Sequence, residues 1–445
     1  MRLLYLTAGA ADMYCGSCLR DNALASVLLA RGHEVVLAPI YTPTLTDERN
    51  VSRSKVFFGG ISVYLEQHVP LFRRTPWLLD RLWDSAPMLK LASKRQIKVD
   101  PAVLGGMTVS MLRGSEGHQR KEIDKLVHWL KQEPTFDAIN LPFTLLIGLA
   151  KPLRDALGVP IACTMQGEDL FLENLQEPWK TQSLELIRGK IGDVDLFLPV
   201  SDYYRRFMSG YLGIPDDRMK VVPLGISLGG YEPAVARPLE AVARPLEAVA
   251  RPFRAREHPP TIGFFGRIAP EKGLHLLVEA YHRLKQKTAM PLRLVAGGYL
   301  GPEHKEYFDG ILKRVGELGL SGEFTYAGSP DRAGKQQLLR TFDVMSMPAT
   351  YDEPKGLTLL EAMASGVPVV EPARGSFTEI IEKTGGGLLV PPDDPDALAQ
   401  GLLRVLTDRP LAAELSSRGA IGVRAHYSVD VMADAAEAAY RYVAR

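Results

Sequence analysis

Residues 342–370, FDVMSMPATYDEPKGLTLLEAMASGVPVV, contain a complete strand–loop–helix–strand unit. The apolar run 344–347 is typical of a buried strand, and a helix is predicted from about 356 to 365. Gly366 follows the last periodic residue, which is a usual signal for the end of a helix. Val367–Val370 begins the next strand. A unit of this kind predicts an α/β protein with a parallel sheet covered by helices.

Two carboxylates in this unit need partners. Glu361 is the only charge in a predicted helix that is apolar nearly all round, so the helix is expected to be buried. A buried carboxylate needs fixed hydrogen-bond donors, and the hydroxyl groups of a ligand would serve. Glu353 lies in the loop before the helix, where the first-turn N–H groups of Gly356, Leu357 and Thr358 form an anion site. This order of groups suits a sugar, a diphosphate and a ribose.

The two glutamates within EPKGLTLLEAMASGVPVV resemble the signature of the retaining glycosyltransferases of family 4. The resemblance implies the GT-B fold, which has two Rossmann-like doubly wound domains facing across a cleft. It also implies that Glu353 approaches the donor sugar and that Glu361 holds the ribose. The alternative without a ligand is a buried helix whose glutamate accepts a hydrogen bond from a neighbouring backbone donor. Lys355 stands where the family often has an aromatic side chain.

A second motif, GRIAPEKG, follows the apolar strand TIGFF and opens a predicted helix at residues 274–285. It resembles the family segment in which Gly266 meets the donor and Arg267 and Lys272 clamp its diphosphate. Two fixed cations opposite two phosphates would also stabilise the charge that builds on the leaving group. The alternative is a surface ion pair of either cation with Glu271. The resemblance implies no cofactor beyond a UDP-, GDP- or ADP-linked sugar as substrate, and no metal.

The length, charge balance and cysteine content predict an ordinary cytoplasmic enzyme. The chain has 445 residues, 53 basic and 52 acidic, and this balance argues against a general nucleic-acid partner. Three cysteines fit a reducing compartment better than a disulfide framework. The apolar start, residues 3–7, is predicted to be a first strand rather than a signal peptide.

The N-terminal half opens as a Rossmann-type strand, small-residue loop and helix. Gly16 occupies the position where family members bring backbone close to the donor phosphate. Cys15 and Cys18 form a C-x-x-C pair in the same region, which is consistent either with a redox role or with simple packing at a turn. Packing is favoured, because no thioredoxin-sized unit accompanies the pair.

Polar residues follow two further predicted strands, where acceptors gather in open parallel sheets. Asn140 and Gln166 stand where the family commonly carries histidines, and amides cannot act as bases at neutral pH. Glu168 and Asp169 are therefore the candidate carboxylates for orienting the acceptor, with helix capping as the equal alternative. The D-x-D triplet at 193–195 precedes a buried strand and is interpreted as structural rather than metal-binding.

The predicted organisation has four parts, and a heptapeptide repeat marks the seam. Three copies of a V-A-R-P motif, each with a proline, begin at Val235, Val242 and Val249, and they suggest an exposed linker insert rather than a coiled coil. We expect deletion of one copy to leave activity intact. The parts are an acceptor-side domain, the linker, a donor domain and a helix that crosses back to the first domain, at residues 1–222, 223–260, 261–427 and 428–445.

The sequence therefore predicts a hexosyltransferase that moves a sugar from a nucleotide-diphospho-sugar to an unidentified glycan, lipid-linked sugar or small molecule. A strand is expected at residues 56–65. The basic segment 71–95 could serve as a lid or a peripheral membrane contact, although ordinary amphipathic helices are favoured. The rivals are a sugar-nucleotide epimerase of the same fold and a non-catalytic nucleotide-sugar binding protein. The oligomeric state, the base, the sugar and the acceptor are left open, because pocket shape sets specificity.

Overall fold

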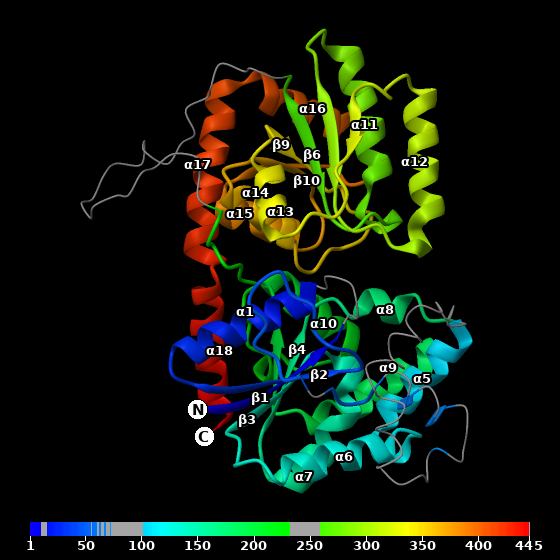
Figure 1. Cartoon of the computed structure of the whole chain (residues 1–445), viewed down its shortest axis with the longest axis vertical. Helices are drawn as coiled ribbons and strands as arrows, with labels where there is room; N and C mark the ends of the chain where they lie inside the picture. The colour runs from blue at the N-terminus through cyan, green and yellow to red at the C-terminus, as the bar shows by residue number, and fades with distance from the viewer. Residues whose placement is uncertain are drawn as a thin grey trace, which may run out of the picture. The chain divides into compact units, whose positions relative to one another are not determined.

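The chain forms two compact units in a computed structural model, and Figure 1 shows each unit as a sheet flanked by helices. The first unit is Met1–Pro223 with Met432–Arg445, and the second is Leu224–Val431. Each has its own cluster of buried apolar side chains. The structure describes residues 1–9, 16–54, 56–59, 62–63, 66–67, 72, 101–231 and 259–444.

The first unit contains a five-stranded parallel sheet in the order β2-β1-β3-β4-β5. Its strands are nearly all buried, as expected for a parallel sheet with helices on both faces. Strand order reverses between β1 and β3, and ligands of such sheets bind beyond the carboxyl ends at this switch point. The strands are β1 (Arg2–Ala8), β2 (Glu34–Ile40), β3 (Ala138–Leu141), β4 (Ile161–Met165) and β5 (Leu196–Pro199).

The C-terminal helix α18 begins in the second unit and runs into the first, which confirms the predicted crossing-back helix. Its Tyr440 hydroxyl donates to the Tyr5 hydroxyl of β1 at 2.6 Å, and both side chains are buried. The helices of this unit are α1 (Gly16–Ala30), α5 (Pro101–Arg113), η2 (Gly114–Glu116), α6 (Arg120–Leu130), η3 (Thr144–Leu149), α7 (Ala150–Leu157), α8 (Asp169–Glu173), α9 (Trp179–Gly189), η4 (Ile191–Asp193), α10 (Asp202–Leu212), η5 (Asp216–Arg218) and α18 (Val429–Val443).

The second unit contains a six-stranded parallel sheet in the order β11-β10-β9-β6-β7-β8. Chain order reverses between β6 and β9, so the loops that follow these two strands meet at the switch point. These loops carry the two motifs singled out in the sequence. The strands are β6 (Thr261–Phe265), β7 (Arg293–Gly297), β8 (Phe324–Tyr326), β9 (Val344–Met345), β10 (Val369–Pro372) and β11 (Gly387–Val390).

Helices form two layers in the second unit: α11 packs on α16, and α17 packs on α14 and α15. The helix α14 is buried over most of its surface, as its apolar sequence predicts. The helices are η7 (Pro270–Lys272), α11 (Leu274–Lys287), η8 (Pro302–His304), α12 (Lys305–Glu317), α13 (Arg332–Leu339), α14 (Leu357–Ala364), α15 (Ser376–Thr384), α16 (Pro395–Thr407) and α17 (Arg409–His426).

The predicted strand over residues 56–65 is wrong for the residues that the structure describes there. Phe57 makes only an isolated bridge to Ile40, and residues 62–63 are helical. The reason is local, because Phe58 has a φ of 54°, which turns the chain out of an extended path.

Several predictions lie outside the described residues. They concern the loop before Gly16 with Cys15, nearly all of the basic segment 71–95, and the three repeat copies. Among the helices that the structure does describe, none combines the length and the apolar character needed to cross a bilayer.

Candidate functional site

The turn after β6 brings Lys272 against the loop that follows β9. Gly273, which precedes α11, has a φ of 76°, and a Cβ there would lie 1.8 Å from the carbonyl oxygen of Pro348. Only glycine permits this close approach of the two loops. At Gly266, a Cβ would lie 2.9 Å from the sulfur of Met347. The glycines of the second motif therefore let the two motifs pack directly together.

Lys272, Tyr351 and Glu353 form one hydrogen-bonded cluster. The Lys272 ammonium donates to the Tyr351 hydroxyl at 2.7 Å and pairs with the Glu353 carboxylate. The Tyr351 hydroxyl also donates to Glu353, and the backbone N–H of Lys355 donates to the other carboxylate oxygen at 3.2 Å. Glu353 is only 4% exposed. Burial alone would raise its pKa, but Lys272 and the hydrogen bonds outweigh burial and lower the pKa to about 2. Glu353 is therefore a fixed anion.

Arg267 lies at the edge of this cluster. Its guanidinium pairs with Glu271, which is the surface ion pair considered as the alternative from sequence. Its side chain is 42% exposed. Burial and the Glu353 carboxylate raise the pKa of Tyr351, whereas the charge of Arg267 lowers it, so Arg267 is close enough to act on the cluster. Its predicted role as a diphosphate clamp stays a prediction.

The segment from β10 to α15 holds the Glu353 loop at three points. Both carboxylate oxygens of Glu371 accept from the backbone N–H of Met347, at 3.0 and 3.2 Å. Arg374 donates to the carbonyl of Ala349 and pairs with Asp393 at 2.8 Å. The N–H of Ser376 donates to the carbonyl of Glu353 at 2.8 Å. The position of the Glu353 carboxylate is therefore set by a neighbouring strand and turn.

Glu361 is buried in α14, and the protein itself supplies fixed donors to one of its oxygens. Its Oε1 accepts from Lys335 of α13 at 2.7 Å and from the Tyr231 hydroxyl at 2.9 Å. Gly356, at the start of α14, has a φ of 67°, and Leu357 and Thr358 form the first turn of the helix. That turn lies directly after the Glu353 loop, as the spacing predicts.

The acceptor-side residues lie in β3 and directly after β4, and most of their polar atoms form hydrogen bonds within the protein. Asn140 accepts from Thr164 at 3.1 Å, and Gln166 donates to the carbonyl of Pro142 at 3.0 Å. The side-chain oxygen of Gln166 is buried and has no hydrogen-bond donor among the described residues.

The carboxylate of Glu168 connects two loops instead of capping a helix. It accepts from the backbone and hydroxyl of Thr144 and from the N–H of Gln166. Glu168 precedes α8 but makes no side-chain capping bond, so the capping alternative is wrong for this residue. Asp169 accepts from the Tyr204 hydroxyl at 2.6 Å. Burial raises the pKa of Glu168, and the backbone hydrogen bonds oppose the rise. A role for either carboxylate toward an acceptor stays a prediction.

The D-x-D triplet and the cysteine of α1 both make contacts within the protein. Asp195 accepts from the N–H of Ile161 at 2.7 Å, and Arg154 pairs with Asp193 at 3.2 Å. Cys18 is buried in α1, where its thiol donates to the carbonyl of Ala8. Gly16 is the first residue of that helix.

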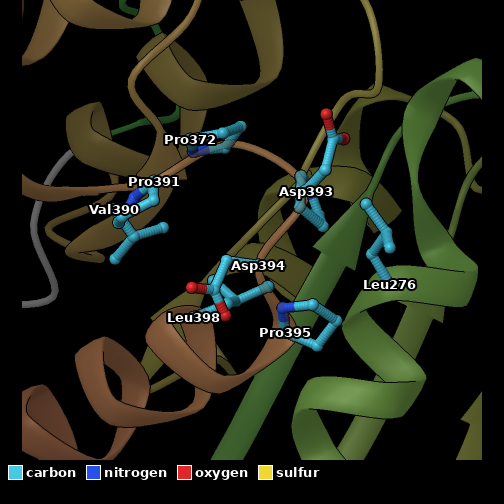
Figure 2. A pocket seen from close by; sticks show the side chains of 9 residues that line it. Leu276, Pro372, Val390, Pro391, Asp393, Asp394, Pro395 and Leu398 are labelled. Carbon is cyan, nitrogen blue, oxygen red and sulfur yellow. The ribbon is translucent and has the colours of Figure 1, made fainter.

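A small hollow opens beside the Glu353 loop, and Figure 2 shows the residues around it. Prolines of three exit loops line it, and Asp394 uses its carboxylate to cap α16. Asp393 pairs with Arg374. The hollow is mainly apolar and does not suit a sugar phosphate. Its lining residues are Leu276, Pro348, Pro372, Val390, Pro391, Asp393, Asp394, Pro395 and Leu398.

Sequence reasoning missed Tyr351, Tyr231, Lys335 and Arg374. Tyr351 lies two residues before Glu353, so its position in the motif was a usable signal. Lys335 and Tyr231 lie 26 and 130 residues from Glu361, and no local pattern connects them.

Two family models match this chain: Glycosyltransferase Family 4 over residues 103–229 and Glycosyl transferases group 1 over residues 247–421. Together they cover more than half of it. D-inositol 3-phosphate glycosyltransferase of Stackebrandtia nassauensis is 34% identical over 184 residues, 40% of this chain and 41% of that protein. The lipopolysaccharide core biosynthesis mannosyltransferase LpsB of Rhizobium meliloti is 32% identical over 193 residues, 41% of this chain and 52% of that protein. This chain spans about half the length of the curated relatives that it matches.

Two solved structures resemble the chain over nearly its whole length. Anabaena Alr3699/HepE in complex with UDP has a TM-score of 0.67 at 16% identity and covers 99% of this chain and 100% of its own. Sucrose-phosphate synthase from Thermosynechococcus elongatus has a TM-score of 0.69 at 19% identity and covers 99% of each chain. At these identities the likeness establishes the fold alone.

Proposed function

The chain belongs to the family-4 glycosyltransferases with the GT-B fold, and we propose that it transfers a sugar from a nucleotide-diphospho-sugar to a hydroxyl group of an acceptor. One observation carries the proposal: Lys272 and Glu353 meet at the switch point of the second sheet, directly before the first turn of α14. That arrangement places an ammonium group and free helix N–H groups beside one fixed carboxylate.

The donor diphosphate would lie between Lys272 and the first turn of α14, at Gly356, Leu357 and Thr358. Amide hydrogens and an ammonium group suit phosphate oxygens, and such charge-assisted bonds are the stronger kind. Glu361 follows in α14 and would receive the ribose. Relatives support this class of donor, because Anabaena HepE was crystallised with UDP and with UDP-glucose.

The reaction would retain the configuration of the transferred sugar. Glu353 is locked by Lys272 and Tyr351, so it is poorly placed to attack the sugar as a nucleophile. The acceptor oxygen would instead form its bond to the anomeric carbon on the face from which the diphosphate leaves. As the bond between that carbon and the phosphate oxygen breaks, the acceptor proton passes to the departing phosphate. Lys272 and Arg267 would stabilise the charge on the diphosphate in this step.

The acceptor would be a hydroxyl group of a glycan, a lipid-linked sugar or a small molecule, bound by the first unit. Gln166 supports this placement, since its buried side-chain oxygen has no donor among the described residues and can accept from a hydroxyl group.

The test measures binding first and turnover second. UDP-, GDP- and ADP-sugars are screened by thermal shift, and a donor that binds only the native state raises the melting temperature. Hydrolysis of the best donor is then followed with the wild-type protein, with Glu353→Gln and with the exposed control Lys383→Ala. We expect one donor to stabilise the protein, slow hydrolysis in wild type and control, and none in Glu353→Gln. Failure of every donor to bind, or wild-type hydrolysis by Glu353→Gln, would refute the proposal.

A further inference from the structure

The parallel ladder between β9 and β10 is short, with Val369 paired to Met345. The N–H of Met345 donates to β10 at 3.0 Å, and the N–H of Ser346 donates to β6 at 2.9 Å. In a parallel sheet, alternate residues of a central strand bond to the same neighbour. Met347 is therefore the next residue whose N–H would donate to the main chain of β10 if the ladder continued.

The side chain of Glu371 takes the place of this missing rung. The N–H of Met347 donates to its two side-chain oxygens, at 3.0 and 3.2 Å. Glu371 belongs to β10 and is fully buried. β9 ends at this point, and the chain continues into the loop that carries Glu353. The start of that loop is therefore held by a side chain rather than by the backbone of the sheet.

Glu371 has no counter-charge among the residues that the structure describes, and the N–H of Met347 is its hydrogen-bond donor. An unpaired carboxylate in the interior is so costly that the group keeps its proton instead. Burial raises the pKa of Glu371 well above the ordinary value, and the hydrogen bond from Met347 opposes this rise only in part. Glu371 thus differs from Glu353, which Lys272 keeps ionised.

The charged side chains on the elements around β10 have partners of their own or lie in solvent. The helices that pack on β10 are α14, α15 and α16. Glu361 pairs with Lys335, Glu379 with Lys383, Asp396 with Arg283, Glu353 with Lys272, and Arg374 with Asp352 and Asp393, while Asp394 caps α16 and Glu382 and Arg404 are exposed. None of the ion pairs within the described part of the chain includes Glu371.

We propose that Glu371 is a positioning residue that acts as a neutral acid: its uncharged carboxyl group completes the ladder at Met347 and so fixes the start of the loop that carries Glu353. The inference rests on the proposed function only for the role of Glu353 toward the donor. Loss of the proton would leave an unpaired charge beneath the loop, and its relief would require the loop to move aside and admit water. The position of Glu353 is thus coupled to the protonation of a buried residue that is not itself placed against a substrate.

The protonation state is tested on the protein alone. A neutral Glu371 loses its proton on unfolding above the ordinary pKa of 4.5, so its stabilising contribution is complete below that pH and declines as the pH rises. Urea unfolding compares wild type with Glu371→Gln from pH 5 to pH 7, because glutamine has a similar shape and cannot ionise. We expect wild type to lose stability relative to the variant, with the ratio of unfolding constants changing about tenfold per pH unit. The exposed control Glu382→Gln should give a constant ratio. A constant ratio for Glu371→Gln would overturn the inference.

The positioning role is tested by hydrogen exchange at Met347 and by donor kinetics. Glu371→Leu has a similar size but no acceptor for the Met347 N–H. We expect exchange roughly tenfold to a hundredfold faster than in wild type and a higher donor KM, and Glu371→Gln should restore both to within about threefold. Wild-type exchange in folded Glu371→Leu, or fast exchange in Glu371→Gln, would overturn the inference.

Two further outcomes have defined readings. If Glu371→Leu fails to fold, Glu371→Asp replaces it, because its carboxyl group is one methylene too short to reach Met347. If the wild-type protein turns over no donor, the proposed function is refuted, and the unfolding and exchange measurements still decide the role of Glu371.

Discussion

Glu353 is an ionised carboxylate in a place where burial alone would keep it neutral. Its pKa of about 2 depends on Lys272 and on hydrogen bonds from Tyr351 and Lys355. The same contacts neutralise Lys272 in the free protein. A diphosphate that enters this site would form an ion pair with Lys272. Glu353 would then keep its hydrogen bonds from Tyr351 and from the backbone of Lys355, so neither charge would lack a partner.

Removal of the Lys272 charge should slow transfer strongly. Lys272→Ala deletes the ammonium group that would face the leaving diphosphate, and loss of one such stabilising group lowers kcat by roughly 10²- to 10³-fold. Steady-state kinetics measure the effect, and circular dichroism shows whether the fold is intact. The control is Lys383→Ala, which removes an exposed lysine paired with Glu379 one turn away. Wild-type turnover by purified Lys272→Ala would contradict the role.

Glu353 should also make the protein sensitive to acid. Its pKa is depressed in the folded state, so its stabilising contribution is present above the ordinary value of 4.5 and is lost as the pH falls toward about 2. The difference corresponds to about 3 kcal/mol. Urea unfolding of wild type and Glu353→Gln between pH 6 and pH 2 measures it. We expect the difference in unfolding free energy between the two proteins to shrink across that window, and a constant difference would show that Glu353 is not held by Lys272.

At the scale of elements, the exit of β10 positions the loop that follows β9. Glu371, Arg374 and Ser376 each hold one point of that loop. Gly375 makes the close approach feasible, because a Cβ there would lie 2.6 Å from the backbone nitrogen and oxygen of Glu353. Its φ of 56° and ψ of −142° are also strained for other residues. The position of Glu353 therefore depends on the turn at Gly375, which is not itself proposed to contact a substrate.

Gly375→Ala should weaken both the fold and the site. The added methyl group meets backbone, which cannot move aside cheaply, and the backbone strain alone costs about 1–3 kcal/mol. We expect a lower melting temperature and a higher KM for the donor. Gly310→Ala is the matched control: it lies within α12, a Cβ there has nothing within 4 Å, and alanine favours a helix interior. The idea fails if both variants behave alike.

At the scale of the whole molecule, α18 ties the end of the chain to its beginning. The helix starts in the second unit, and from Met432 onward it belongs to the first. Tyr440 packs edge-on against Tyr5 with ring centroids 6.0 Å apart and donates to its hydroxyl. The first unit is therefore completed by residues that the chain supplies last.

Tyr440→Phe should destabilise the first unit without affecting the donor site. The change removes a buried hydrogen bond and leaves the Tyr5 hydroxyl without that donor, at a cost of about 1–2 kcal/mol. Denaturant unfolding measures the loss, and thermal shift with the best nucleotide checks the second unit. Tyr442→Phe is the control, because Tyr442 is 52% exposed. Equal stability of the two variants would argue against the docking role of Tyr440.

The parallel-sheet architecture and the two motifs whose residues meet at Lys272 and Glu353 could be predicted from local patterns. Apolar runs, glycines at helix ends and the spacing of Glu353 and Glu361 depend on neighbours a few residues away, so they can be read along the chain. The prediction over residues 56–65 failed where a single backbone torsion at Phe58 overrode an apolar pattern.

The partners of the charges could not be read in the same way. Lys335 and Tyr231 reach Glu361 from distant segments, and Arg374 reaches both Ala349 and Asp393. Burial makes such pairing necessary, because an uncompensated charge is costly in the interior. Strand order and helix packing bring remote segments together and so decide which residue pairs with a buried charge. The spacing of residues along the chain does not determine these partners. The donors that surround Glu361 are therefore decided by the tertiary structure alone.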